Sequence, residues 1–116
     1  MRVIIAGGRD FNNYSLLEEE MDFLNDRLAH CITVVSGGAK GADALGELWG
    51  RENDLRVRVF PAKWDEYGKS AGYRRNVDMA NHSEMLVAFW DGKSKGTKHM
   101  IDIALEKGLL VQVVRY

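Results

Sequence analysis

Residues 34–43 read Val34-Val35-Ser36-Gly37-Gly38-Ala39-Lys40-Gly41-Ala42-Asp43, and this stretch decides the predicted fold. The apolar, largely β-branched residues 32–35 are typical of a buried strand. Residues 42–49 then form a helical pattern with Leu45, Leu48 and Trp49 on one stripe. A glycine turn between a strand and a helix leaves backbone N–H groups free to bind phosphate or another anion. The same turn also fits a purely structural role, in which glycine supplies a positive φ and binds nothing.

The rest of the chain alternates strand and helix patterns. We expect further strands at residues 2–6, 55–60, 85–89 and 109–114, and helices at residues 15–29, 72–81 and 97–107. Ser15 and Glu18 fit a capping box at the start of the first helix. Residues 62–71 have no clean period and are predicted to be a long loop. The expected core faces of the first and last helices comprise Leu16, Met21, Leu24, Leu28, Met100, Ile101, Ala104 and Leu105.

This β-α-β-α-β-α-β-α-β order predicts an α/β domain of three layers, with about five parallel strands and helices on both faces. Ligands of such sheets bind at the carboxyl ends of the strands, near the point where the strand order reverses. Glycine turns follow the predicted first, second and fourth strands, at residues 7–8, 37–41 and 92–96. Because all three turns belong to that one edge, their convergence favours a binding site there.

Composition limits the classes of protein and partner. The 116 residues, of which 46% are hydrophobic and 28% charged, predict one globular domain over residues 1–116. The formal net charge of −1 makes nucleic acid an unfavoured partner. The three histidines and the single Cys31 show no metal-ligand spacing, so we expect no metal and no cofactor. The chain shows no signal peptide and no membrane-spanning apolar run, so we expect a cytoplasmic protein.

Several side chains at the predicted edge suit a phosphate ligand. Its candidate cations are Arg9, Lys40, Arg74, Arg75, Lys93, Lys95 and Lys98. The hydroxyls of Ser36 and Thr97 fit either a turn or a ligand contact. Asp43 fits either a cap on its own helix or a contact to a ribose hydroxyl, and Asp91 is a candidate proton carrier. The aromatic residues Trp64, Tyr67 and Trp90 fit a pocket wall or a subunit interface.

Four motifs in order resemble the YspA-type family of the SLOG superfamily. They are Gly7-Gly8-Arg9-Asp10-Phe11, Ser36-Gly37-Gly38-Ala39-Lys40-Gly41-Ala42-Asp43, Ala71-Gly72-Tyr73-Arg74-Arg75-Asn76 with Met79, and Phe89-Trp90-Asp91-Gly92-Lys93-Ser94-Lys95-Gly96-Thr97-Lys98-His99-Met100-Ile101. The resemblance implies a Rossmann-like fold and a nucleotide or nucleotide-derived ligand. It also implies a homodimer. The family is found in bacteria and their phages.

Two related families frame the expected activity. The lonely-guy phosphoribohydrolases, which cleave a base from a nucleoside monophosphate, have motifs similar to Ser36-Gly37-Gly38, to Arg75 with Met79, and to Gly96-Thr97. Their catalytic glutamate falls at Met100 here, which leaves Asp91, with Arg75, as the candidate catalytic pair of an N-glycosidase-like hydrolase. The DNA-processing protein A family has a turn similar to residues 36–43, which makes a single-stranded nucleic-acid binder the other alternative.

The prediction from the sequence is therefore a domain that binds a nucleotide or nucleotide-derived phosphate at the strand ends. The expected ligand-binding residues are Gly7, Gly8, Arg9, Ser36, Gly37, Gly38, Lys40, Gly41, Asp43, Arg75, Asn76, Gly96 and Thr97.

Overall fold

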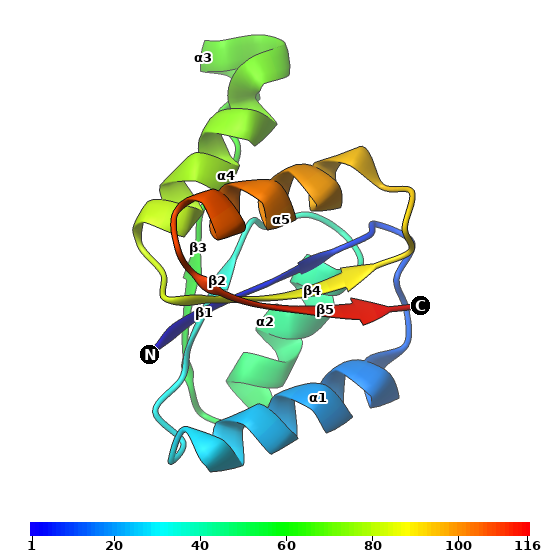
Figure 1. The fold of residues 1–116 in the computed structure, drawn as a ribbon, viewed down its shortest axis with the longest axis vertical. Coiled ribbons are helices and arrows are strands. Elements are labelled where there is room, and N and C mark those ends of the chain that lie inside the picture. Colours follow the sequence, from blue (N-terminus) through cyan, green and yellow to red (C-terminus); the bar gives the residue numbers. More distant parts are fainter.

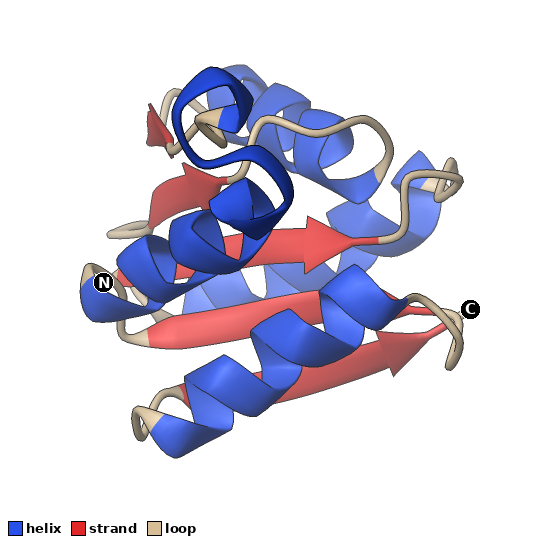
Figure 2. Cartoon of the chain, turned by 90° about the horizontal axis from the view of Figure 1, so that it is seen from above, coloured by secondary structure: helices blue, strands red, loops and turns tan.

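Five strands form one sheet in the order β3-β2-β1-β4-β5 in the computed structural model, which describes residues 1–116 (Figure 1). They are β1 (Arg2–Gly7), β2 (Thr33–Ser36), β3 (Arg56–Val59), β4 (Met85–Trp90) and β5 (Leu110–Arg115). All neighbouring strands pair in parallel, so their carboxyl ends lie along one edge of the sheet (Figure 2). This confirms the predicted parallel sheet of five strands.

Helices cover both faces of the sheet, as the alternating pattern predicts. They are α1 (Tyr14–Arg27), α2 (Ala42–Glu52), α3 (Trp64–Tyr67), the 3₁₀ turn η1 (Gly68–Ser70), α4 (Ala71–Asn81) and α5 (Lys95–Glu106). The pair α1 and α2 lies on one face, and α4 with α5 lies on the other (Figure 1). The chain runs from β1 outward to β3 and then returns to β4 on the other side of β1. The strand order therefore reverses between β1 and β4.

The core consists of two layers, one on each face of the sheet. Strands β1 and β4 are buried on both faces, which explains their continuous apolar sequences. Below the sheet, Trp49 of α2 is fully buried, and its indole Nε1 donates a hydrogen bond to Oδ1 of Asp22 at 2.8 Å. Above it, Met79 of α4 packs with Met100 of α5. Core side chains therefore cover β1 and β4 on both faces, at the place where the strand order reverses.

The first helix begins one residue earlier than predicted and has a different cap. Asn13 is the N-cap, and its Oδ1 accepts a hydrogen bond from the backbone N–H of Leu16 at 3.1 Å. The predicted capping box of Ser15 and Glu18 is therefore wrong, because Ser15 already lies inside the helix. The helix ends at Arg27, two residues before the predicted end, since Ala29 and His30 have positive φ.

The predicted loop at residues 62–71 is helical instead. It contains α3 and η1, which lead directly into α4 and project beyond the sheet (Figure 1). No residue of α3 or η1 is buried, so neither element has an apolar stripe that a periodicity analysis could detect.

Two predicted core residues lie on the surface. Leu48 of α2 is 44% exposed and Leu105 of α5 is 59% exposed. In α5, Ile103 is buried in addition to Met100 and Ala104. Packing against the sheet decides which face of each helix is buried. The number of apolar residues in the helix does not decide this.

Candidate ligand-binding site

A cavity of about 710 Å³ lies at the carboxyl edge of the sheet, where the strand order reverses. Its walls come from the end of β1, from the loops after β1, β2 and β4, and from α2, α3, α4 and α5. Of the site residues predicted from the sequence, those that line it are Gly7, Arg9, Asp43, Arg75, Asn76, Asp91, Gly96 and Thr97. The fold thus brings together residues from four segments at the predicted edge.

Arg75 is fixed in the cavity wall by two hydrogen bonds. Its Nη1 donates to the backbone carbonyl of Gly37 at 2.6 Å, and its Nε donates to Oδ1 of Asn76 at 3.1 Å. Burial lowers the pKa of Arg75, and the nearby Asp43 opposes that shift. Its neighbour Arg74 lies outside the cavity, with its guanidinium 4.3 Å from the ring centre of Tyr67. The two consecutive arginines therefore have different surroundings.

Asp43 is a buried acid that holds the second glycine turn. Its Oδ2 accepts the backbone N–H of Ala39 at 3.2 Å, and only 6% of the residue is exposed. Burial raises the pKa of Asp43 to about 6, although the Ala39 amide and Arg75 act in the opposite direction. The predicted role of Asp43 as the cap of its own helix is wrong. Gly41 is the N-cap of α2, and no side chain makes a capping hydrogen bond at this helix end. Asp43 instead places a titratable carboxyl group in the cavity.

Some of the predicted glycines serve packing between loops. Gly41 has a φ of 75°, and a Cβ there would collide with the backbone carbonyl of Gly8. That carbonyl also accepts the backbone N–H of Ala42 at 3.2 Å. Gly8 and Gly41 do not line the cavity. For these two positions the structure supports the purely structural role of a glycine turn.

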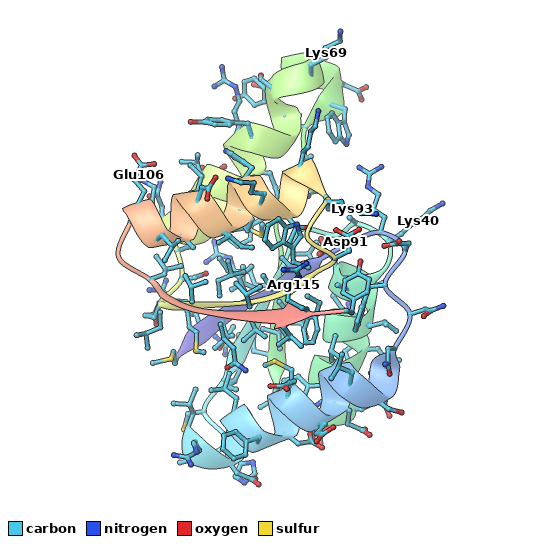
Figure 3. All side chains as sticks on the ribbon, turned by 45° about the vertical axis from the view of Figure 1, so that its right-hand side comes forward. Lys40, Lys69, Asp91, Lys93, Glu106 and Arg115 are labelled. Atoms are coloured by element: carbon cyan, nitrogen blue, oxygen red, sulfur yellow. The ribbon has the colours of Figure 1, made fainter.

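The rest of the second turn lies behind the cavity wall. The buried Ser36 donates from Oγ to Oε2 of Glu47 at 2.6 Å and accepts the backbone N–H of Gly38 at 3.1 Å. Lys40 is exposed and extends away from the fold (Figure 3). Among residues 36–41 only Ala39 lines the cavity. The turn therefore shapes the wall and positions Arg75, whose Nη1 it holds through Gly37.

The N-terminus of α5 opens into the cavity. Ser94 is the N-cap, and its Oγ accepts the backbone N–H of Thr97 at 3.4 Å. The first-turn amides of Lys95 and Gly96 have no intrahelical acceptor. A Cβ built at Gly96 would meet no atom within 4 Å, so the space beside this glycine is open. This open first turn differs from the closely packed turn at Gly41.

Asp91 stabilises the loop that leads into α5. Its Oδ1 accepts the backbone N–H groups of Lys93 and Ser94, each at 2.8 Å. These two hydrogen bonds lower the pKa of Asp91. A carboxylate that stays ionised and is already engaged by the backbone is poorly suited to donate a proton, which argues against the predicted role as a proton carrier.

The remaining candidates divide between the cavity and the surface. Lys95 and Trp64 line the cavity, whereas Lys93, Lys98, Tyr67 and Trp90 do not. The cavity wall also contains Tyr73 and His99, whose rings lie 4.4 Å apart between centres. Neither was predicted from the sequence as a site residue. Both lie inside the motifs that carry the family resemblance, Tyr73 in residues 71–76 and His99 in residues 89–101, and this position is the signal that could have identified them.

The fold is that of a Rossmann-like α/β protein, with a cavity at the point where its strand order reverses. A model of the YspA, cpYpsA-related SLOG family matches residues 1–67, which is more than half of the chain. The chain belongs to this family, as its motifs predict. The match ends before α4 and α5, which carry Arg75, Asn76, Gly96 and Thr97.

Two further proteins are similar to this chain. The Gene 61 protein of Mycobacterium phage D29 is 31% identical over 116 residues, covering 95% of this chain and 93% of that protein. The X-ray structure of DNA processing protein A from Streptococcus pneumoniae superposes with a TM-score of 0.79 at 19% identity. That superposition covers 97% of this chain and 49% of the solved chain, so this chain spans about half of its length. At this identity the superposition shows a shared fold.

The structure contains neither a cluster of metal-binding side chains nor a membrane-spanning helix. No group of three or more His, Cys, Asp or Glu side chains is arranged to hold a metal ion. No helix has both the length and the apolar character needed to cross a membrane.

Proposed function

We propose that this protein binds a nucleotide or a nucleotide-derived phosphate in the cavity at the carboxyl ends of β1 and β4. The observation that carries the proposal is that Arg9, Arg75 and the open first turn of α5 share one cavity with an aromatic wall. Its volume of about 710 Å³ lies within the range of about 300–1,000 Å³ that is usual for small-molecule sites.

In this proposal the phosphate lies between Arg9, Arg75 and the first turn of α5. A helix N-terminus attracts an anion through its free N–H groups and its dipole, and Gly96 leaves room for close approach. Arg9 takes part in none of the four ion pairs of the protein, so its charge is available to a ligand. Arginine suits this task because its planar guanidinium can form two parallel hydrogen bonds to a phosphate.

The acidic residues of the cavity do not contradict an anionic ligand. Asp91 and Asp43 accept hydrogen bonds from backbone amides of their own loops. Asp10 accepts the hydroxyl of Tyr116 at 2.7 Å. Each carboxylate is thus partly compensated by the chain.

The base is placed against the aromatic wall formed by Trp64 and Tyr73, of which 52% and 56% are exposed. Aromatic side chains that remain partly exposed at a cavity can stack on a heterocycle, and such stacking tolerates different bases. The arginines and α5 therefore select for a phosphate group, whereas the aromatic wall accepts different bases.

Consecutive arginines provide a matched test. We expect nucleoside 5′-monophosphates to raise the melting temperature of the wild type, since a ligand at a hundred times its Kd stabilises by about 2.7 kcal/mol. The Arg75→Ala variant should lose most of this affinity, whereas Arg74→Ala should keep it because Arg74 lies outside the cavity. Equal losses in the two variants, or equal binding of nucleosides that lack a phosphate, would contradict the proposal.

The hydrolase alternative is addressed by a base-release assay on the same nucleotides. Met100 lines the cavity, and this is the position where the phosphoribohydrolases place their glutamate. A thioether can neither transfer a proton nor stabilise a cationic sugar, so we expect no turnover. Robust release of free base by the wild type would replace the binding proposal with the hydrolase.

The nucleic-acid alternative is addressed by titration with a single-stranded oligonucleotide. Affinity for nucleic acid depends largely on clustered cations that release counterions, and the net charge here is −1. We therefore expect weak binding at physiological salt. Tight binding with a steep salt dependence would favour the alternative.

A further inference from the structure

The turn after β1 carries a cation and an acid side by side. Arg9 and Asp10 are both exposed, and both line the cavity. The backbone N–H of Phe11 donates to the carbonyl of Gly8 at 3.2 Å, which closes the turn around them. Arg9 nevertheless forms no ion pair with Asp10 or with any other acid. A carboxylate one residue away competes with a phosphate for the guanidinium, so the position of Asp10 bears directly on the charge available to a ligand.

Tyr116 holds the Asp10 carboxylate. Its hydroxyl donates to Oδ1 of Asp10 at 2.7 Å, which joins the segment after β5 to the loop after β1 (Figure 1). Burial and this hydrogen bond raise the pKa of Tyr116 to about 12, so the hydroxyl keeps its proton at neutral pH and can donate it. A Cβ at Gly8 would collide with both partners. The absence of a side chain at Gly8 therefore makes room for the contact.

The core fixes the Tyr116 side chain in turn. Its ring packs edge-on against Phe11, with the ring centres 4.8 Å apart, and Phe11 is buried. The backbone N–H of Tyr116 donates to the carbonyl of Trp90 at 3.3 Å. Tyr116 does not line the cavity, so its effect on a ligand there passes through Asp10.

We propose that Tyr116 is a positioning residue for Arg9: its hydroxyl holds the Asp10 carboxylate away from the Arg9 guanidinium, which stays free for a ligand phosphate. This rests on the proposed function, which supplies the phosphate. Without the hydroxyl, Asp10 loses its partner, and rotation of its side chain brings the carboxylate to Arg9. The ligand must then break an ion pair before it binds, and repulsion between the carboxylate and the phosphate adds to the loss.

Two tyrosine-to-phenylalanine variants test the role of the hydroxyl. Tyr116→Phe keeps the ring against Phe11, and we expect its affinity for a nucleoside 5′-monophosphate in calorimetry to fall about 3- to 10-fold, the equivalent of one hydrogen bond. Tyr14→Phe is the matched control, because the Tyr14 hydroxyl donates to Oε1 of Glu52 at 3.0 Å and neither residue lines the cavity. This control should leave the affinity unchanged. Equal affinities of the wild type and Tyr116→Phe, or equal losses in the two variants, would overturn the proposal.

Asp10→Asn separates positioning from packing. An asparagine carries no charge that competes for Arg9, so in this background the change Tyr116→Phe should no longer reduce the affinity. If Tyr116 only supported the loop through packing, the loss would be the same in both backgrounds. That result would refute the positioning role.

The contact itself is tested without a ligand, by ultraviolet titration of the phenol groups. The difference in absorbance between each protein and its Tyr116→Phe counterpart isolates the ionisation of Tyr116. This ionisation should occur at a lower pH in Asp10→Asn than in the wild type, because the carboxylate stabilises the protonated phenol. An unchanged titration would overturn the proposal. If the wild type binds no nucleoside monophosphate, the proposed function fails and the positioning role fails with it, whereas binding that Tyr116→Phe does not weaken removes the positioning role alone.

Discussion

Replacing Asp43 with asparagine is expected to stabilise the protein at neutral pH. Asp43 is 6% exposed, and burial raises its pKa from the ordinary 3.8 to about 6. In the unfolded chain the carboxyl group ionises near its ordinary value, so the folded state holds a proton that the unfolded state has lost. As the pH rises between these two values, the wild type loses stability, and above about 6 the loss is constant.

The size of this effect follows from the shift. One pH unit corresponds to about 1.4 kcal/mol, so the ionised carboxylate costs the folded state about 3 kcal/mol at pH 7. An asparagine has no such cost. Between pH 4 and pH 7, the free energy of unfolding of the wild type should therefore fall by about 3 kcal/mol relative to that of Asp43→Asn. For a domain of this size, that corresponds to about 10 °C in melting temperature.

Urea unfolding followed by circular dichroism, at intervals from pH 4 to pH 8, measures the difference directly. The informative quantity is how the difference between the two proteins changes with pH, because any fixed effect of the substitution on packing cancels. A difference that stays constant with pH, or one that favours the wild type increasingly as the pH rises, would refute the assignment of a raised pKa. Confirmation would mean that the protein keeps a destabilising acid beside Arg75, as is common at functional sites.

Further predictions concern other positions. Asp91→Asn should show the opposite pH trend, because hydrogen bonds to the carboxylate lower the pKa of Asp91 and their stabilisation is lost as the pH falls; urea unfolding in acid measures this. Gly96→Val should abolish binding of nucleoside monophosphates in calorimetry with the melting temperature retained, because its side chain would enter open space beside the cavity. Gly41→Ala should destabilise by about 2 kcal/mol or more in urea unfolding, since its φ is 75° and the facing loop leaves no room. Trp49→Phe should cost about 1–2 kcal/mol in the same assay, because it breaks the bond to Asp22.

Gly96 is a better probe of the cavity than the glycines of the second turn. Gly38 has a φ of 75°, so a valine there would be strained whether or not a phosphate binds nearby. Gly37 is packed against the side chains of Arg75 and Asp43. Substitutions at either position would confuse a loss of folding with a loss of binding.

The strand and helix patterns along the chain were enough to predict the sheet and the edge at which the cavity lies. The alternation of strand and helix patterns predicted five parallel strands, and the structure contains them. Because parallel strands all end at the same edge of a sheet, the sequence alone placed the three glycine turns at one edge. The choice of Arg75 over Arg74 came from the family resemblance and agrees with the cavity.

The sequence could not identify the roles of individual groups within that edge. Gly41 and Gly96 are the same residue type at comparable positions, yet one is enclosed by a backbone carbonyl and the other faces open space. The pKa of Asp43 depends on burial by segments far from it in the chain. The helix at residues 64–67 also escaped detection, because it buries no side chain that would produce a periodic pattern.

Two features of the cavity depend on contacts between distant segments of the chain: the strands that flank it and the orientation of its polar groups. The connection that returns from β3 to β4 carries α4 back across the sheet, and this brings Arg75 of α4 within hydrogen-bond reach of Gly37 in the turn after β2. Nε of Arg75 donates to Oδ1 of Asn76 in the same network. Local sequence sets elements and their order through steric and hydrophobic preferences. The direction of a hydrogen bond between residues that are distant in the chain is fixed only when packing brings a donor to an acceptor.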